Sequence, residues 1–169
     1  MKQNKIYIYG RHAVEEALSH APRVVSKIHL SSKMNDRHLR ELIARSGIPV
    51  EPLDERKATS QAEGGVPHQG IIALISLPGL GIPFENFLNS FSASPDSALV
   101  FLSEVQDPHN VGAMIRSAAA FGAAAVLMPT RKQSPVSGAV VKASAGMAFR
   151  IPLVAVENTQ QAIAKLKKI

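Results

Sequence analysis

The stretch from Leu99 to Gly122 constrains the fold most, because it places a strand, a tight loop and a helix directly one after another. The apolar run 98–102 predicts a buried strand, which the polar cluster 106–109 ends. A helix follows, with Asn110 as its expected N-cap and an apolar stripe at helical spacing: Val111, Met114, Ile115 and Ala118. In an open parallel sheet the loop would lie at the carboxyl edge of a strand, where ligands bind and where a helix N-terminus favours anions.

Arg116 lies off this apolar stripe, one turn after Gly112. Helical side chains lean back toward the N-terminus, so the guanidinium is expected to lie along the helix over Gly112 and reach the loop near Asn110. A capping asparagine and an ordinary solvated arginine are the simpler interpretation of this spacing taken alone. The residues by themselves leave both interpretations open.

The composition favours an α/β protein. Hydrophobic residues make up 46% of the 169 residues, yet there is no Trp and there are only two Tyr and six Phe. The core must therefore be built from Ala, Val, Ile and Leu, which is typical of helices packed on a parallel sheet. The net charge of +6 suits a polyanionic partner, and the positive surplus is shared evenly by the two halves of the chain.

Several classes of site are absent from the sequence. There is no cysteine, and the six histidines do not have metal-ligand spacing, so no metal is expected. Neither a glycine-rich dinucleotide fingerprint nor a P-loop is present. The apolar stretch near the N-terminus is too short for a signal peptide or a membrane span, so we expect no membrane and a cytoplasmic location.

The first 77 residues alternate strand and helix and are expected to form one compact α/β domain, 1–77. Strands are predicted at 5–9, 24–30, 48–53 and 68–77, and helices at 13–19, 36–46 and 55–61. The middle helix has Leu39, Leu42 and Ile43 as its apolar face and Gly47 as its C-terminal stop.

Residues 78–97 differ in composition and are expected to form a linker with one short helix. Prolines, glycines and serines flank four apolar residues at helical spacing, Phe84, Phe87, Leu88 and Phe91. This helix is expected to dock on the following domain, 98–169. A membrane-touching helix is the weaker alternative, because its other face has no Lys or Arg.

The domain 98–169 is expected to be a parallel, Rossmann-like sheet with right-handed crossovers. Further strands are predicted at 123–128 and 151–156, and further helices at 136–144 and 159–168, the last with Ile163 and Leu166 facing inward. The loop 130–135 is polar and basic, and it would lie at the same carboxyl edge as Asn110.

Three stretches carry a resemblance to a known family. The sequence DPHNVGAMIRSA at 107–118 resembles the first motif of the SpoU-type RNA ribose 2′-O-methyltransferases, the knotted SPOUT enzymes. The stretches at 9–18 and 68–73 resemble the N-terminal RNA-binding domain of the branch that modifies a guanosine of large-subunit ribosomal RNA. The implied fold is a small, ribosomal-protein-like α/β domain followed by the beginning of a SPOUT methyltransferase domain.

The resemblance implies methyl transfer from S-adenosylmethionine to a ribose 2′-hydroxyl. Asn110 and Arg116 match the active-site positions, and Glu104, Asp107 and Pro108 would shape the loop. An arginine side chain is a poor general base, so Arg116 is interpreted as a phosphate and oxyanion clamp. A deprotonated arginine is the family's alternative, and the general base stays open.

The resemblance also implies RNA contacts and a substrate. Ribosomal RNA is the expected partner, with transfer RNA as the alternative, and the complete enzyme is expected to be a homodimer. A turn-forming role is the alternative for His68 and Gln69, and ordinary solvation is the alternative for the three cations of the second domain. The RNA-binding candidates are Arg11, His12, His68, Gln69, Arg131, Lys132 and Lys142.

Relatives continue after the position of Ile169 with a glycine-rich loop and a Ser-Leu-Asn-rich stretch that is threaded into a knot. Most of the donor pocket is expected there, so the 169-residue chain alone is expected neither to bind S-adenosylmethionine appreciably nor to turn over. The alternatives are a non-catalytic RNA-binding module and a small-molecule α/β enzyme. The latter would need a cofactor signature that the sequence lacks.

Overall fold

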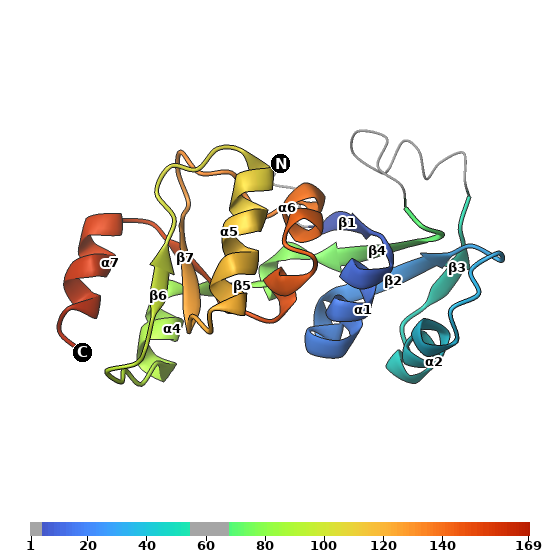
Figure 1. Ribbon diagram of the computed structural model, residues 1–169, viewed down its shortest axis with the longest axis horizontal. Helices are drawn as coiled ribbons and strands as arrows, with labels where there is room; N and C mark the ends of the chain where they lie inside the picture. The colour runs from blue at the N-terminus through green and yellow to red at the C-terminus, as the bar shows by residue number, and fades with distance from the viewer. Residues whose placement is uncertain (1–4, 55–67) are drawn as a thin grey trace.

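The computed structural model describes residues 5–54 and 68–169, in which two four-stranded sheets lie end to end along the long axis (Figure 1). The helix predicted over 55–61 lies outside the described residues. The other predicted elements are present, with ends shifted by at most three residues. We call the first sheet with its helices the N-terminal unit and the second sheet with its helices the second unit.

The N-terminal unit has a mixed sheet in the order β1-β4-β2-β3. Strand β4 runs antiparallel to β1 and β2, whereas β2 and β3 are parallel. Asp36 begins α2 by accepting the Leu39 N–H at 3.1 Å, and Gly47 ends it in the left-handed conformation. The elements are β1 (Lys5–Tyr9), α1 (Arg11–His20), the 3-10 turn η1 (Pro22–Val24), β2 (Val25–Leu30), α2 (Arg37–Ser46), β3 (Val50–Pro52) and β4 (Ile71–Ser76).

The second unit has an all-parallel sheet in the order β5-β8-β7-β6, which confirms the predicted parallel architecture. Strand β5 was not predicted, since it falls in the expected linker. The elements are η3 (Leu77–Gly79), β5 (Gly81–Pro83), α4 (Phe84–Ser90), β6 (Leu99–Phe101), α5 (Pro108–Ala120), β7 (Ala125–Pro129), α6 (Gly138–Ala143), η4 (Met147–Phe149), β8 (Leu153–Val156) and α7 (Thr159–Leu166).

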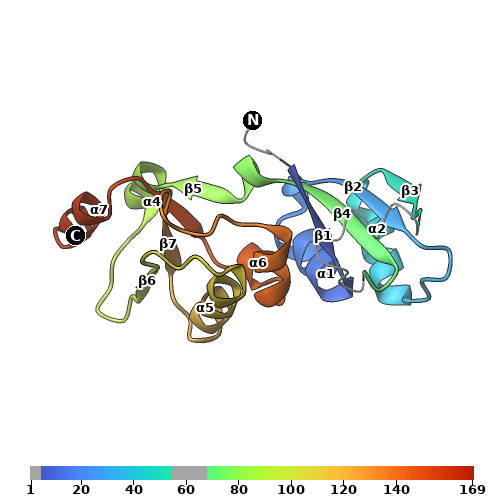
Figure 2. The ribbon, with the colours of Figure 1, turned by 90° about the horizontal axis from the view of Figure 1, so that it is seen from above.

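Helices cover both faces of this parallel sheet, so its two central strands, β7 and β8, are largely buried (Figure 2). On one face, Phe87 of α4 and Ala162 of α7 pack with Leu127 of β7, which confirms that the linker helix docks on this sheet. On the other face, α5 packs on β7, whose Val126 and Met128 belong to the same core as Val111 and Ile115, and α6 packs on α5.

Helix α7 is rotated from the expected position. Ile163 was predicted to face inward, but its exposed fraction is 39%, whereas Ala162 is buried against the sheet. The small side chain of Ala162 lets the helix lie close to the valines of β8, and Leu166 remains packed on the same cluster. Spacing alone cannot distinguish these neighbouring rotations, because Ala162 and Ile163 are both apolar.

One continuous apolar core joins the two units. It contains Ile8 and Val14 of the N-terminal unit and Val111, Val140 and Phe149 of the second unit. Both views place α6 beside β1, and the contacts between these elements agree (Figures 1 and 2). Among the described residues, none of the helices has the length and apolar character needed to cross a membrane.

Candidate functional site

Helix α5, which carries both catalytic candidates, begins earlier than predicted. Its N-cap is Asp107, whose Oδ1 accepts the His109 N–H at 2.9 Å, so the prediction of Asn110 as N-cap is wrong. Pro108 explains the shift, since proline lacks an N–H and has a fixed φ that suits the first helical position. Asn110 therefore lies in the first turn of the helix, with its side chain exposed.

Gly112 serves the packing of α5 rather than the placement of Arg116. A Cβ atom added to Gly112 would lie 2.5 Å from the Cβ of Ala143 and 2.7 Å from the carbonyl oxygen of Val140. Helix α6 thus occupies the space over Gly112, and the prediction that the guanidinium lies there is wrong. Met114 leaves the predicted stripe as well, with an exposed fraction of 42%.

Arg116 is exposed on α5, and within residues 5–54 and 68–169 it has neither a hydrogen bond nor an ion pair. No interaction links it to Asn110, which lies more than one turn earlier on the same helix. The simpler interpretation of a solvated arginine describes this geometry, and it leaves the guanidinium free to meet an anion.

Hydrogen bonds join the loops that follow β6 and β7, where α5 begins. Gln133 Oε1 accepts the Val105 N–H at 2.9 Å, and the Val105 carbonyl accepts the Ser134 N–H at 2.9 Å. Lys132 Nζ lies 3.8 Å from Glu104 Oε1. Sequence reasoning missed Gln133, whose role depends on this contact between loops.

Both residues of this exposed ion pair have strained backbones. Glu104 has φ 55° and Lys132 has φ 54°, in the left-handed region that side chains other than glycine rarely adopt. Such strain persists where neighbouring bonds hold it and is common in loops that bind ligands. Arg131 precedes Lys132 in the same loop and is exposed, so the structure brings these two RNA-binding candidates close to Glu104.

The two signature stretches of the N-terminal unit meet at one corner. Gln69 Oε1 accepts the backbone N–H of Arg11 at 3.0 Å, and His68 Nδ1 accepts the Gly70 N–H at 3.1 Å. The His68 bond lies within the turn before β4, as its alternative interpretation expects, whereas the Gln69 bond joins this turn to the start of α1. RNA contacts by these two residues stay a prediction. His12 is exposed at the same end of α1.

The Arg11 guanidinium forms an ion pair with Asp36 at the start of α2. The Leu39 N–H, and after it the Arg11 side chain, lower the pKa of the Asp36 carboxyl. Since half of the Arg11 side chain is exposed (51%), its remaining donors stay accessible from outside.

Lys142 lies apart from the basic loop, where the two units meet. Its Nζ is 5.4 Å from the centre of the Tyr9 ring, so it forms a cation-π contact across the boundary. The candidates thus fall into three places: the corner at Arg11, the loops beside α5, and the boundary between units. No single cluster contains them all.

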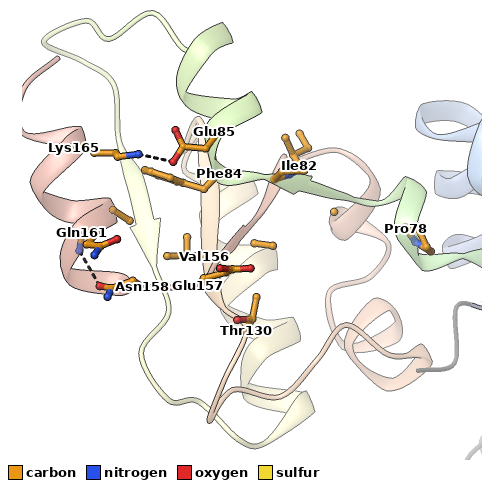
Figure 3. A pocket seen from close by; sticks show the side chains of 14 residues that line it. Pro78, Ile82, Phe84, Glu85, Thr130, Val156, Glu157, Asn158, Gln161 and Lys165 are labelled. Carbon is orange, nitrogen blue, oxygen red and sulfur yellow. Dashed lines mark hydrogen bonds and ion pairs between the residues drawn. The ribbon is translucent and has the colours of Figure 1, made fainter. Parts of the chain in front are cut away.

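A cavity of about 610 Å³ was not anticipated from the sequence (Figure 3). It lies between β5, the end of β8 and α7, and the ion pair between Glu85 and Lys165, at 2.5 Å, crosses it from α4 to α7. Its lining includes Thr130, Val156 and Glu157, so the cavity lies at the carboxyl ends of β7 and β8, next to the edge strand β5. Among the described residues, no group of three potential metal ligands was found.

Two family models match the chain, one on each unit. Residues 7–79 match the model for RNA 2′-O ribose methyltransferase substrate binding, and residues 97–169 match the SpoU rRNA methylase family. Each unit is therefore similar to a protein domain of known family.

Curated relatives match both units in one alignment. The chain is 36% identical to a 23S rRNA (guanosine-2′-O-)-methyltransferase RlmB of Pseudomonas putida and 37% identical to that of Pseudomonas aeruginosa, covering 95% of this chain and 65% of each relative. It is 36% identical to the enzyme of the same name from Xanthomonas axonopodis, covering 99% of this chain and 68% of the relative. The chain thus spans about two thirds of the length of these relatives.

Solved structures share the fold. The SpoU methyltransferase AviRb from Streptomyces viridochromogenes, in complex with AdoMet, has a TM-score of 0.78 at 18% identity, over 98% of this chain and 60% of that one. An AdoMet-bound rRNA methyltransferase from Sinorhizobium meliloti has a TM-score of 0.74 at 21% identity, over 98% and 59%. The likeness extends over both units and their arrangement.

Proposed function

Since the chain belongs to the SpoU rRNA methylase family, we propose that the complete protein transfers a methyl group from S-adenosylmethionine to a ribose 2′-hydroxyl of RNA. The names of the relatives favour a guanosine of 23S-type ribosomal RNA as the acceptor. The proposed division is an RNA-binding domain over 1–77, a linker with a helix over 78–97, and the beginning of the methyltransferase domain over 98–169.

The observation that carries this proposal is the placement of Arg116. It is exposed on α5, with no hydrogen bond or ion pair in the described part of the chain, and α5 begins where two loops are hydrogen-bonded together at the carboxyl edge of a parallel sheet. This edge is where α/β proteins bind their ligands. A guanidinium without a protein partner can donate two parallel hydrogen bonds to phosphate oxygens or to a developing oxyanion.

In the proposed reaction a bond forms between the ribose 2′-oxygen and the methyl carbon, while the bond from that carbon to the donor's sulfur breaks. The donor supplies an electrophilic methyl group when it is bound. Arg116 would orient the phosphate next to the acceptor ribose and stabilise negative charge on its 2′-oxygen. Asn110, in the first turn of the same helix, would hydrogen-bond the ribose, and the proton acceptor is not assigned.

The described residues fit the RNA side of this reaction better than the donor side. The cavity beside β5 is large enough for a small ligand and lies at the carboxyl ends of β7 and β8, whereas α5 follows β6 at the far side of the sheet. We assign none of the described residues to S-adenosylmethionine.

Arg116→Ala in the complete protein tests this proposal. Loss of one transition-state charge contact should lower the rate of methyl transfer by about 10²–10³-fold. Unfolding by urea should be unchanged, because Arg116 is exposed and forms no hydrogen bond or ion pair with the described residues. Arg45→Ala, at an exposed position near the end of α2, is the matched control. Near wild-type turnover of the Arg116 variant would return this residue to the class of solvated surface cations.

Ribosomal RNA fragments and transfer RNA should be offered as substrates in the same assay, because transfer RNA is the alternative acceptor. Methylation of transfer RNA alone would overturn the ribosomal assignment.

A homodimer of the complete enzyme and a cytoplasmic location stay part of the proposal. The exposed Phe121 on α5, with 90% of its surface accessible, is compatible with a protein contact at this helix.

A further inference from the structure

We infer that Glu16 and Arg150 are positioning residues that hold the RNA-binding corner of the N-terminal unit in one fixed placement relative to α5. The inference rests on the proposed function in taking RNA as the ligand. We call the surface where α6 and η4 meet β1 and α1 the joint; its residues are Tyr7, Tyr9, Glu16, Gly138, Lys142, Gly146 and Arg150.

The ion pair across the joint is bidentate. Arg150 Nε lies 2.5 Å from Glu16 Oε2, and Arg150 Nη2 lies 2.7 Å from Glu16 Oε1. Only 16% of the Glu16 side chain is exposed, and the hydrogen bonds to Glu16 raise the pKa of Arg150. Two parallel hydrogen bonds between planar groups restrict rotation as well as distance, so this pair sets an orientation.

Two glycines of the second unit lie in close contact with the N-terminal unit around this pair. A Cβ atom added to Gly146 would lie 2.6 Å from both Cβ and Cγ of Glu16, and φ at Gly146 is +80°. A Cβ atom added to Gly138 would lie 2.5 Å from the carbonyl oxygen of Tyr7. With no side chain between the units at either point, a small rotation would produce a clash with backbone or with the stem of Glu16.

Buried apolar contacts supply the cohesion of the joint. Ile8 of β1 and Val14 of α1 belong to the same core as Val140 of α6 and Phe149 of η4. Opening the joint would expose these side chains to water, which is unfavourable in proportion to the apolar area exposed. The core therefore keeps the units together, and the ion pair with its glycines selects one orientation.

Helix α1 connects the joint to the RNA-binding corner. Glu16 lies in the same helix as Arg11 and His12, one turn after His12, so fixing Glu16 also fixes the helix start. Helix α5 packs on α6 through Gly112, which joins Arg116 to the other side of the joint. The corner at Arg11 and the start of α5 are thus held at one fixed distance. An RNA long enough to reach both, once bound at one, binds the other at a high effective concentration.

Distance measurements test the joint without any RNA. The chain has no cysteine, so spin labels can be placed at Ala44→Cys in α2 and Ala120→Cys in α5, both exposed positions. Pulsed electron paramagnetic resonance should give a narrow distance distribution for the parent chain and a clearly broader one for Arg150→Gln. The exchange variant Glu16→Arg with Arg150→Glu should narrow it again.

Lys165→Gln is the matched control, since it breaks the Glu85–Lys165 ion pair inside the second unit at a side chain as exposed as Arg150 (48% each). It should leave the distribution narrow. If Arg150→Gln does not fold, Arg150→Lys keeps one charge contact without the bidentate geometry and should broaden the distribution to a smaller extent. An unchanged distribution in the folded Arg150 variant overturns the inference.

RNA affinity gives the functional readout. For ribosomal RNA fragments of increasing length, affinity for the parent chain should rise sharply once a fragment spans both places. Arg150→Gln should lower the affinity for long fragments by about tenfold or more, because the effective concentration at the second place is lost. The affinity for short fragments should be unchanged. Equal weakening at all lengths contradicts a positioning role. If the parent chain binds no RNA, the proposed function fails, and the distance measurements still decide whether the joint is fixed.

Discussion

The joint between the two units and the carboxyl-edge loops of the second unit are built in opposite ways. At the joint, Gly138 and Gly146 have no side chains, which allows close approach to the Tyr7 backbone and to Glu16, and the ion pair there is partly buried. At the loops, Glu104 and Lys132 keep long side chains on strained backbones and remain exposed. The joint depends on the absence of side chains at two glycines, whereas the loops proposed for the reaction present charged side chains to a ligand.

The largest effect is expected for Gly112→Val in α5, because even a single added carbon would meet Ala143 and the Val140 carbonyl. Overpacking of this kind typically costs about 1–3 kcal/mol, and a β-branched side chain against backbone belongs at the upper end. Ala113→Val, at the neighbouring exposed position, is the control and should cost well under about 1 kcal/mol. Urea unfolding followed by circular dichroism measures both, and equal losses would show that the contact between α5 and α6 is loose.

A smaller loss is expected for Gly138→Ala at the joint, about 1–3 kcal/mol, since the added carbon would approach the Tyr7 carbonyl. Gly81→Ala in β5 is the matched control, because nothing lies within 4 Å of its added carbon. There the lower entropy of the unfolded chain should make the change neutral or slightly stabilising. Thermal unfolding compares the two, and a neutral Gly138→Ala would mean that the joint opens easily.

The smallest effect is expected for Asp36→Asn, at the corner where Asp36 pairs with Arg11. The folded state lowers the pKa of Asp36, so its charge stabilises the fold above the usual pKa of 3.8, and this stabilisation is lost as the pH falls through the folded value. Asparagine caps helices as well as aspartate does, so the variant removes the charge alone. It should be less stable than the parent at neutral pH and equal to it in strong acid. Melting curves at several pH values measure this, and a difference that persists in strong acid would contradict the charge mechanism.

Features that depend on neighbouring residues were predictable from the sequence. Strand β1 has its predicted bounds, and α2 begins after Asp36 and ends before Gly47, because capping uses backbone groups within one turn of the cap. The parallel sheet also followed from short loops between alternating strands and helices. The roles of Asn110 and Arg116 in the reaction stay predictions, carried by the motif they match.

The tertiary structure alone decided the features that depend on distant partners. From the sequence, Gly112 was expected to leave space for Arg116, but in the structure α6 packs against it. Glu16 was only one residue of a signature stretch in the sequence, whereas in the structure it pairs with Arg150, 134 positions later. Strand β5 was not predicted because its three residues, Gly81–Pro83, include a glycine and a proline and have little strand propensity; it forms only by pairing with the edge of β8. A sequence determines capping and periodicity within a few residues, but a close approach between two backbones exists only after both elements have folded against each other.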